Sequence, residues 1–498
     1  MNYLGAILCC VFGLLKADAQ GISVRGKVFE DSNKNKVYDL GEPLLSGVLL
    51  SNGRDLVATN AQGEYQIELI PDLSVFIIKP SGFQSPLSKN NKVEFFIPLK
   101  QNDAEEIYDF PLYKQEENKR SDFVLLGDLQ VDVMDDINHV EKLVVEELAK
   151  DPPDLIFPLG DLVFDNLEIF EPLAQSLGLI GAPIYYVAGN HDLNFGREKL
   201  EQRDDSFKRV FGPSYYALEY GEQLIVVLNN IIPISDKEYV GGIDVMQKVF
   251  LNKILQEFKH RKITVMMHIP VEFMEDKNDF LELFAEYPEV FIATGHTHTQ
   301  YHKYFERKNN PAIHQLVAGA VCGAWWQGPH DIEGIPFAMM YDGTWKGYWH
   351  LYTDAGKQQL QYKVSGRSES KQMSIWSPEY KDWDQSLHHL NDQYIYVNVF
   401  AADQNTQVEI SFDDGPWSAM HYFEGVDPAY KRLIALQDQG RYNNGKTSSM
   451  VDAKRISTHL WRFPVPFKNH NSPGIAKIRA IAKNLGLNHV ETRVFRAL

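Results

Sequence analysis

The pattern of hydrophobic and polar positions divides the 498-residue chain into three regions. Residues 20–117 contain short apolar runs separated by Gly, Pro, Asn and Asp, which is typical of strands joined by tight turns. Over 118–365, apolar runs of four to eight residues alternate with segments of helical spacing such as Ile137–Leu148. Strand-like runs return over 366–498. We therefore predict an all-β, sandwich-like N-terminal domain, an α/β core of layered sheets flanked by helices, and a β-rich, sandwich-like C-terminal domain.

The first 19 residues have the pattern of a signal peptide. An apolar run, Tyr3–Leu15, is followed by a small–x–small sequence before Gln20. The run is too short to span a membrane stably, and no later segment is long enough. We therefore expect a secreted or periplasmic protein, although the absence of Lys and Arg near Met1 leaves an uncleaved anchor as the alternative. After cleavage the only cysteine is Cys322, so no internal disulfide is expected.

Polar motifs stand directly after five of the apolar runs in the middle domain. They are Asp128-Leu129-Gln130, Gly160-Asp161, Gly189-Asn190-His191-Asp192, His268 and Gly295-His296-Thr297-His298. Because ligands bind at the carboxyl ends of strands in an open α/β sheet, these groups are predicted to converge on one crevice. Carboxylates, imidazoles and amide oxygens bind divalent metal ions, and a pair of such ions can clamp a phosphate and activate water.

The order of these motifs resembles that of the calcineurin-like metallophosphoesterase superfamily, over about half of the chain. With its flanking β domains, the whole chain resembles secreted bacterial members of that group. The resemblance implies a metallophosphoesterase core, two divalent ions (Mn, Fe, Zn or Mg) and a metal-bridging hydroxide as nucleophile. It also implies the metal ligands, with Asp161 shared by both ions: Asp128, Gln130, Asp161 and His298 for the first, and Asp161, Asn190, His268 and His296 for the second.

The same resemblance gives His191 a catalytic role in contacting the substrate and Asp192 the role of orienting His191. From the residues alone, Asp192 is equally compatible with a helix N-cap, and His268 with a buried structural histidine. Asp165, shortly after the second motif, is interpreted as part of a solvated loop.

Gln130 departs from the pattern, because the superfamily usually has histidine at this position. An amide oxygen is a harder and weaker ligand than imidazole, which favours manganese, iron or magnesium over zinc. A degenerate site that binds without hydrolysing is the alternative interpretation.

Trp325 and Trp326 follow the last motif within a run of small residues. They are candidates for an aromatic wall beside the substrate, with core packing as the alternative. Cys322 is interpreted as a small buried apolar residue.

The N-terminal domain contains a second candidate metal site with the oxygen spacing of an EF-hand loop. Its candidate calcium ligands are Asp31, Asn33, Asn35, Val37 (through its carbonyl), Asp39 and Glu42. The loop lacks the usual glycine at position six, where Lys36 stands, and no flanking helices are predicted. It resembles calcium-dependent B-type repeats of bacterial surface adhesins, and a solvated turn is the alternative.

The net charge of the chain limits the classes of partner that are expected. The formal net charge of −18 argues against nucleic acid as a partner, and no protein partner is evident. The leading hypothesis is an extracytoplasmic, dinuclear-metal-dependent hydrolase of phosphate monoesters or diesters. The alternatives are a catalytically degenerate surface binding protein on the same scaffold, and a metal-dependent nuclease.

Overall fold

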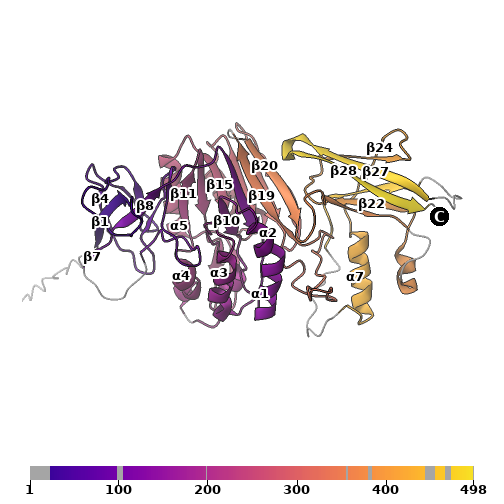
Figure 1. Cartoon of the computed structure of the whole chain (residues 1–498), viewed down its shortest axis with the longest axis horizontal. Helices are drawn as coiled ribbons and strands as arrows, with labels where there is room; N and C mark the ends of the chain where they lie inside the picture. Colours follow the sequence, from indigo (N-terminus) through magenta and orange to yellow (C-terminus); the bar gives the residue numbers. More distant parts are fainter. Residues whose placement is uncertain are drawn as a thin grey trace, which may run out of the picture.

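A computed structural model shows three blocks side by side along the longest axis of the molecule (Figure 1). The described residues are 23–97, 105–197, 199–354, 357–378, 384–442, 455–465 and 473–496. The predicted signal peptide, residues 1–19, lies outside these ranges.

The N-terminal block consists of two small sheets. One has the order β4-β1-β8-β6 with β7 also on β1, and the other has the order β3-β2-β5. Their strands are β1 Ser23–Glu30, β2 Leu49–Ser51, β3 Leu56–Ala58, β4 Glu64–Glu68, β5 Phe76–Ile77, β6 Phe83–Gln84, β7 Glu105–Ile107 and β8 Phe110–Lys114. In β4 the side chains of Tyr65 and Ile67 are buried while the alternating polar positions are exposed, as expected for one covered face.

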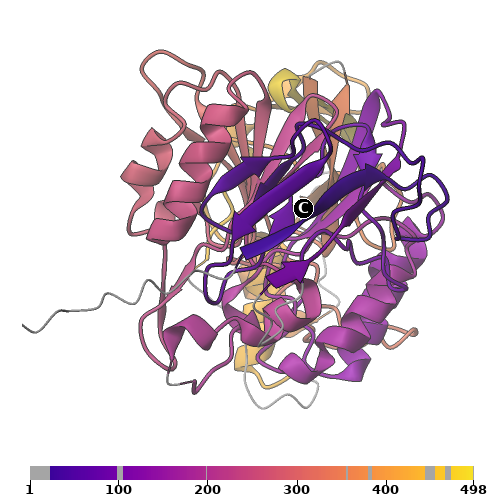
Figure 2. The same cartoon turned by 90° about the vertical axis from the view of Figure 1, so that its left-hand side faces the viewer.

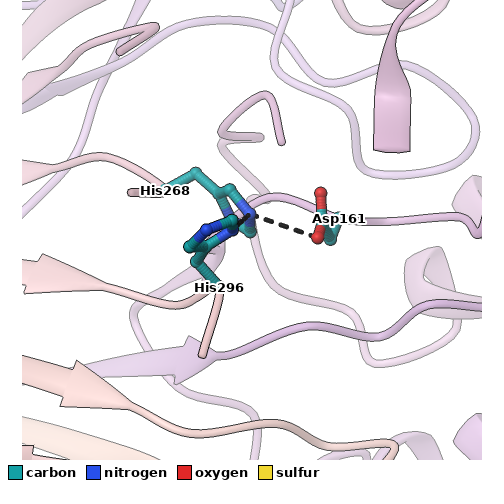
Figure 3. Close-up of side chains that lie close together, drawn as sticks. All are labelled: Asp161, His268 and His296. Atoms are coloured by element: carbon teal, nitrogen blue, oxygen red, sulfur yellow. Dashed lines mark hydrogen bonds and ion pairs between the residues drawn. The ribbon is translucent and has the colours of Figure 1, made fainter. Parts of the chain in front are cut away.

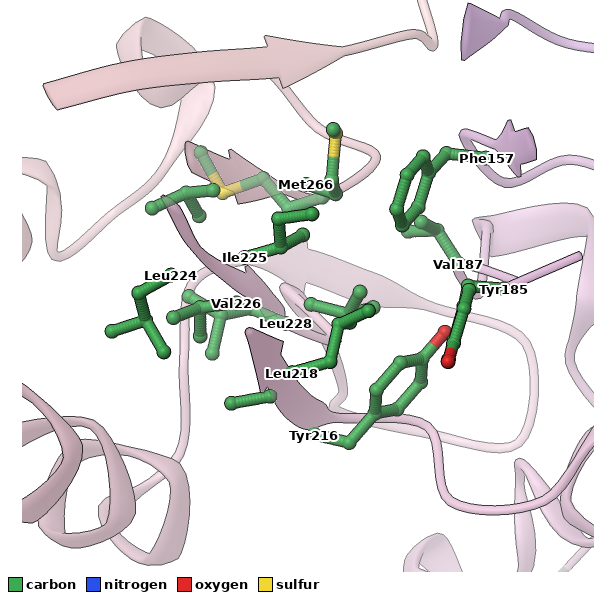
Figure 4. Close-up of a cluster of buried hydrophobic side chains, with 14 of the residues drawn as sticks. Phe157, Tyr185, Val187, Tyr216, Leu218, Leu224, Ile225, Val226, Leu228 and Met266 are labelled. Atoms are coloured by element: carbon green, nitrogen blue, oxygen red, sulfur yellow. The ribbon is translucent and has the colours of Figure 1, made fainter. Parts of the chain in front are cut away.

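The middle block contains two larger sheets that pack face to face. Their orders are β10-β9-β19-β20 and β11-β12-β15-β16-β18-β17. Their strands are β9 Arg120–Leu126, β10 Leu155–Pro158, β11 Tyr216–Tyr220, β12 Gln223–Val227, β15 Lys262–Met266, β16 Val290–Thr294, β17 Gln300–Phe305, β18 Ile313–Ala318, β19 Gly347–Asp354 and β20 Lys357–Val364, with a small hairpin of β13 Ile231–Pro233 and β14 Tyr239–Gly241. Figure 4 shows side chains of both sheets meeting in the core between them.

Helices cover the outer faces of this sandwich, on two sides of the molecule in Figure 2. Strand β9 shows why: Phe123 and Leu125 point into the core between the sheets, whereas Val124 and Leu126 belong to a second core under the helices. The helices are α1 Met134–Val140, α2 Glu146–Leu148, α3 Phe170–Gly178, α4 Asp205–Phe211, α5 Val245–Glu257 and α6 Lys277–Glu282, with a π-helical turn over Glu141–Val145 and 3-10 turns at Leu167–Ile169, Asn190–Asp192, Leu200–Gln202 and Val271–Phe273. The predicted helical pattern over Ile137–Leu148 therefore lies in one continuous helical run.

Two local expectations differ from the structure. The apolar run Ile184–Val187 forms isolated bridges beside β10 in place of a regular strand. The sequence Gly334–Tyr348, with Asp342-Gly343-Thr344 as turn residues, predicts a hairpin that closes the middle domain, but the segment is largely loop with a tight turn at 340–344. The hairpin that completes the first sheet is formed by β19 and β20. In both cases the sequence has the right turn residues and apolar content, but strand pairing depends on neighbours that are distant in sequence.

The C-terminal block is a second sandwich. Its sheets have the orders β21-β22-β26-β25 and β24-β23-β27-β28. The elements are β21 Met373–Trp376, β22 Tyr394–Val399, β23 Gln407–Phe412, β24 Ser418–Ala419, β25 His421–Tyr422, α7 Pro428–Asp438, β26 Leu460–Pro464, β27 Pro473–Ala482 and β28 Leu487–Arg496, with 3-10 turns at Gln385–Leu390 and Lys483–Leu485. Asp427 is the N-cap of helix α7, and its carboxylate accepts the backbone N–H of Ala429 and Tyr430.

Specific contacts join the blocks. The ring of Phe95 in the N-terminal block lies 4.7 Å from that of Tyr216 in the core, centroid to centroid. At the other end, the Gln300 amide donates to the carbonyl of Phe400, and the hydroxyl of Tyr304 donates to Asp403 at 3.0 Å. Within the described ranges, no helix combines the length and apolar character needed to cross a membrane.

Candidate metal centre

The polar motifs meet at the carboxyl ends of parallel strands. Asp128 follows β9, Asp161 follows β10, His268 follows β15, and His296 follows β16. Asn190 joins them from the 3-10 turn Asn190–Asp192. Each side chain is placed by a buried strand, so the arrangement is fixed by the sandwich core.

Three of these side chains form the centre of the cluster. Within the described ranges, the ligand atoms of Asp161, His268 and His296 lie within 4.8 Å of one another (Figure 3). His268 Nε2 is 3.2 Å from Asp161 Oδ2 and 3.2 Å from His296 Nδ1. Asp161 and His268 are fully or almost fully buried.

The hydrogen bonds of His268 direct its Nε2 toward the oxygens of the cluster. Burial disfavours the charged ring, but the nearby Asp161 carboxylate raises the pKa of His268 to about 9. Its Nδ1–H donates to the carbonyl of Leu159 at 2.8 Å, which leaves the lone pair of Nε2 facing inward. That lone pair meets oxygen lone pairs of Asp161 and of Asn190, the latter at 3.1 Å. Only a proton or a metal ion between these atoms removes the repulsion. The donor set therefore fits a divalent metal.

A second set of ligand atoms lies on the other side of Asp161. Asp128 Oδ2 is buried and makes no hydrogen bond to any described residue. His298 Nε2 approaches it at 3.7 Å, while His298 Nδ1 is held by the carbonyl of Gly323 at 2.6 Å. The side-chain NH₂ of Gln130 donates to Asp161 Oδ2 at 3.4 Å. An unsatisfied buried carboxylate oxygen beside an imidazole nitrogen also fits a metal ion.

Electrostatics favour cations here as well. Burial, with the charge of Asp161, raises the pKa of Asp128 to about 7. Burial lowers the pKa of His298 to about 4 and that of His296 to about 3, so both imidazoles stay neutral, which is the form that binds metal. The two buried carboxylates attract positive charge, which is also why the pKa of His268 is raised to about 9 while His296 and His298 stay neutral.

The backbone around these ligands is strained. Four of them adopt positive φ: Gln130 (39°), Asp161 (46°), His296 (78°) and His298 (52°). Such conformations cost energy in non-glycine residues and cluster at functional sites. A Cβ on Gly189 would lie 1.9 Å from the backbone nitrogen of Asp161, so glycine is required for the close approach of these two loops.

His191 stands at the edge of the cluster with a partner that was not predicted. Its Nδ1 lies 2.7 Å from Asp165 Oδ1, and its ring stacks on Phe164 at 4.7 Å. Burial disfavours the charged ring, but the carboxylates of Asp161 and Asp165 raise the pKa of His191 to about 9. The arrangement leaves Nε2 of His191 available to a ligand.

The expected role of Asp192 is corrected. Its carboxylate accepts the backbone N–H groups of Gly189, Leu162 and Val163, at 2.8, 2.9 and 3.2 Å. These bonds fix the loop that carries Asn190 and His191, with Gly189 as the N-cap of the 3-10 turn and Asp192 at its third position, so Asp192 is not the N-cap itself. The contact with His191 Nδ1 belongs to Asp165, which was interpreted as a solvated loop residue.

Trp325 and Trp326 have different surroundings in the structure. Trp326 is completely buried, and its indole N–H donates to the carbonyl of Leu129 at 3.0 Å, so its proposed place in a substrate wall is wrong. Trp325 stacks on Phe164 at 4.3 Å, which makes a column of Trp325, Phe164 and His191. Phe164 had no motif in the sequence, and only its position next to Asp165 could have drawn attention to it.

Tyr239 is a further residue near the centre that sequence reasoning missed. It lies on β14, and burial together with the charges of Asp161 and Asp165 raises its pKa to about 12. No sequence motif marks the hairpin that carries it, so it could not be singled out from the sequence.

The candidate calcium loop is a compact turn after β1. The carboxylate of Asp31 accepts the backbone N–H of Asn35 and of Lys36, and that of Asp39 accepts both Asn33 and Asn35 side-chain amides. Lys36 adopts a positive φ of 66°, at the position where an EF-hand loop has glycine. The loop leads from a strand, so the expected absence of flanking helices agrees with the structure over these residues.

Protein-family models match residues in each of the three domains. Three family models match: the N terminal of Calcineurin-like phosphoesterase over residues 31–115, Calcineurin-like phosphoesterase over 121–300, and the C terminal of Calcineurin-like phosphoesterase over 315–484. The chain belongs to the calcineurin-like phosphoesterases, of the type with N- and C-terminal extension domains. It is a metal-dependent phosphoesterase with the metallophosphoesterase fold, as the motifs predicted, and the family implies two divalent ions.

Similar solved structures include a dimetal phosphatase from Danio rerio (13% identity, TM-score 0.36, 49% of this chain and 96% of that chain). Others are PhoD (10%, 0.38, 72% and 81%) and a phosphatase from Mycoplasma pneumoniae (15%, 0.26, 50% and 95%). No curated protein sequence matches the chain.

Proposed function

We propose that this protein is an extracytoplasmic phosphoesterase whose two divalent ions are held by Asp128, Gln130, Asp161, Asn190, His268, His296 and His298. The observation that carries the proposal is the cluster of ligand atoms from Asp161, His268 and His296, which lie within 4.8 Å of one another beside the buried Oδ2 of Asp128 that has no hydrogen-bond partner among the described residues. Such ions, when bound, neutralise phosphate oxygens and supply an activated water.

The chain's own residues complete the chemistry. His191, held by Asp165 through Nδ1, presents Nε2 toward the substrate and supplies a hydrogen bond or a proton to the leaving oxygen. The ring of Phe164 supports the imidazole from one face. Asp192 fixes the loop that carries both His191 and Asn190 through its three backbone hydrogen bonds.

The ester class is tested with the chain purified from Gln20 onward. Turnover of p-nitrophenyl phosphate and of bis-p-nitrophenyl phosphate is compared after metal removal and after addition of Mn²⁺, Fe²⁺, Zn²⁺ or Mg²⁺. The proposal expects metal-dependent hydrolysis of at least one ester, with Mn²⁺, Fe²⁺ or Mg²⁺ above Zn²⁺ because Gln130 offers an amide oxygen. Gln130→His should move the preference toward Zn²⁺. Absence of turnover with all four metals in a folded, metal-loaded protein would favour the binding-only alternative.

The site of action is tested separately. The proposal expects the mature protein to begin at Gln20 and to be recovered outside the cytoplasm. N-terminal sequencing of protein from the native cell fractions measures this directly, and a cytoplasmic chain that retains Met1 would contradict it.

We also propose that the loop over residues 31–42 binds a structural Ca²⁺. The support is the spacing of its oxygen donors, together with the positive φ of Lys36 at the sixth position. Calcium binding there would stabilise the N-terminal block, which a thermal unfolding experiment with Ca²⁺ or EGTA can measure.

A further inference from the structure

A large cleft runs along the edge strand β17, between the catalytic domain and the C-terminal domain. Its volume is about 760 Å³, which is within the range of ligand sites. One wall consists of β17 and neighbouring loops, and the other consists of residues 402–405, 422–424 and 455–458 of the C-terminal domain. We call it the β17 cleft.

One end of the β17 cleft is formed by residues that neighbour candidate metal ligands in the sequence, although no candidate ligand is among its lining residues. Thr297, which lines it, stands between the candidate ligands His296 and His298. Phe273, also in the lining, belongs to the 3-10 turn that follows His268 by three residues. From there the cleft extends along β17 as far as Glu306. A substrate with its phosphate at the metals could therefore place the rest of the molecule in this cleft.

The walls combine aromatic rings with side-chain amides. Phe273 is 53% exposed, and Tyr301 and Tyr422 are half-buried. Gln404 and Asn405 are exposed on the opposite wall, and their amides make no hydrogen bond to any described residue. Rings offer flat apolar faces, and amides both donate and accept hydrogen bonds.

The β17 cleft is lined by both positively and negatively charged side chains. Lys303 and Arg455 line it together with Glu306 and Glu424. Two further carboxylates are already engaged: Asp403 by the hydroxyl of Tyr304 and the amide of Asn484, and Asp342 by the backbone N–H groups of Gln300 and Thr344. A cleft with mixed charges does not focus a field for a polyanion, so its polar groups suit a neutral ligand rich in hydroxyl groups.

The two walls are also held in place without a ligand. Tyr304 of β17 bonds to Asp403, and Gln300 bonds to the backbone of Phe400, so the catalytic and C-terminal domains are tied at the floor of the cleft. A preformed site of this kind loses little conformational entropy on binding.

From this combination we infer that the β17 cleft binds the carbohydrate part of the substrate, so that the enzyme acts on sugar phosphates or phosphorylated glycans. Sugar rings present apolar C–H faces to aromatic side chains and hydroxyl groups to amides. The inference rests on the proposed function, because it places the phosphate of the same molecule at the metal centre.

The test compares substrates on the Mn²⁺-loaded protein. The kcat/KM values of glucose 1-phosphate, glucose 6-phosphate and N-acetylglucosamine 1-phosphate are measured beside those of glycerol 3-phosphate, a phosphoserine peptide and p-nitrophenyl phosphate. The same set is measured for the double variant Gln404→Ala/Asn405→Ala and for the control Asn488→Ala, an exposed amide of the C-terminal domain outside the cleft. Thermal unfolding checks that all three proteins are folded.

The expected result is a preference for at least one sugar phosphate over glycerol 3-phosphate. In the double variant the ratio of kcat/KM for that sugar phosphate to kcat/KM for p-nitrophenyl phosphate should fall about tenfold, as for two lost hydrogen bonds. The control should keep the ratio of the natural chain.

Three results would overturn the inference. They are no preference for any sugar phosphate, a ratio unchanged in the double variant, or a higher kcat/KM for a phosphoserine peptide than for every sugar phosphate. If the natural chain hydrolyses none of the esters, the proposed function fails first. The cleft is then tested by titration with maltotriose and chitotriose, where binding weakened in the double variant supports it and absence of binding refutes it.

Discussion

At the scale of single residues, catalysis by His191 is expected to depend on which carboxylate holds its imidazole ring. Asp165 is 2.7 Å from His191 Nδ1, whereas the oxygens of Asp192 are occupied by backbone N–H groups. Asp165→Asn should therefore lower kcat about 10- to 100-fold with little change in KM. The loss should be greater for phenyl phosphate than for p-nitrophenyl phosphate, because a more basic leaving oxygen depends more on a correctly held acid.

Asp192→Asn provides the contrast to that variant. Because Asp192 fixes a loop, its replacement should lower the thermal midpoint as well as the activity, whereas Asp165→Asn should leave the midpoint nearly unchanged. Equal kcat values for Asp165→Asn and the natural chain on phenyl phosphate would show that Asp165 does not position His191.

Trp325 and Trp326 give a second test at this scale. Trp326 is fully buried with its indole N–H bonded to Leu129, so Trp326→Ala should lower the free energy of unfolding by about 3–5 kcal/mol. Trp325→Phe keeps a ring against Phe164 and should retain activity, whereas Trp325→Ala should lower kcat by releasing the aromatic column behind His191. Urea unfolding and steady-state kinetics measure the two effects. A stable Trp326→Ala variant would contradict the assignment of this residue to the core.

At the scale of elements, the strands that carry ligands were predictable because their apolar runs are short, continuous and followed by polar motifs. β9, β10, β12, β15 and β16 all lie where such runs predicted strands. The run Ile184–Val187 has the same pattern but pairs only through isolated bridges, because its neighbours in space are set by the loop around it. Local pattern therefore located the elements, and long-range pairing decided which of them became regular strands.

The contact of Asp165 with His191 could not be predicted for the same kind of reason. It depends on a loop conformation with positive φ at Asp165, 68°, and on the stacking of Phe164, neither of which leaves a periodic signal. The ligand motifs, in contrast, follow strands whose carboxyl ends must meet in any such sheet.

Among the secondary-structure elements and loops, the loop over residues 31–42 is predicted to bind calcium. If it binds Ca²⁺, 1 mM CaCl₂ should raise the thermal midpoint of the N-terminal transition relative to EGTA by on the order of 5 °C. Glu42→Gln, at the twelfth position, should remove most of this increase. Mg²⁺ at the same concentration serves as the control for charge screening. An identical increase in the variant and the natural chain would assign the calcium effect to another site.

At the scale of the whole molecule, a buried ion pair lies where the N-terminal domain meets the catalytic domain, and Glu117 of this pair also accepts the backbone N–H of Gly221 in the catalytic domain. Lys79 Nζ lies 2.8 Å from Glu117, and both side chains are almost fully buried. Burial works against the carboxylate, but the Lys79 ammonium holds the pKa of Glu117 below its ordinary value. Glu117→Gln should lower the stability by about 3 kcal/mol at pH 7, because it leaves a buried ammonium without its partner.

The sign of the pH dependence follows from that lowered pKa. The stabilisation by Glu117 is complete above its ordinary value of 4.5 and is lost as the pH falls through the lower value in the folded protein. Urea midpoints at pH 7 and pH 3.5 should therefore differ less for Glu117→Gln than for the natural chain. A variant as stable as the natural chain at pH 7 would contradict this role of the pair.

The order of the three domains was visible in the sequence, but their packing was not. Contacts such as Phe95 with Tyr216, or Tyr304 with Asp403, join residues about 100 positions apart and have no local signature. The β17 cleft arises from this packing, so its residues could not have been grouped from the sequence.

The central claim is that two metal ions at the seven-ligand site make the chain an active phosphoesterase. The most direct measurement is to titrate metal-free protein with Mn²⁺ and follow hydrolysis of bis-p-nitrophenyl phosphate and p-nitrophenyl phosphate against the number of ions bound per chain. Activity should rise to a plateau at about two ions per chain, and Asp161→Asn should bind fewer ions and lose turnover by at least about 100-fold. Full activity in the metal-free protein, or undiminished turnover in Asp161→Asn, would contradict the account.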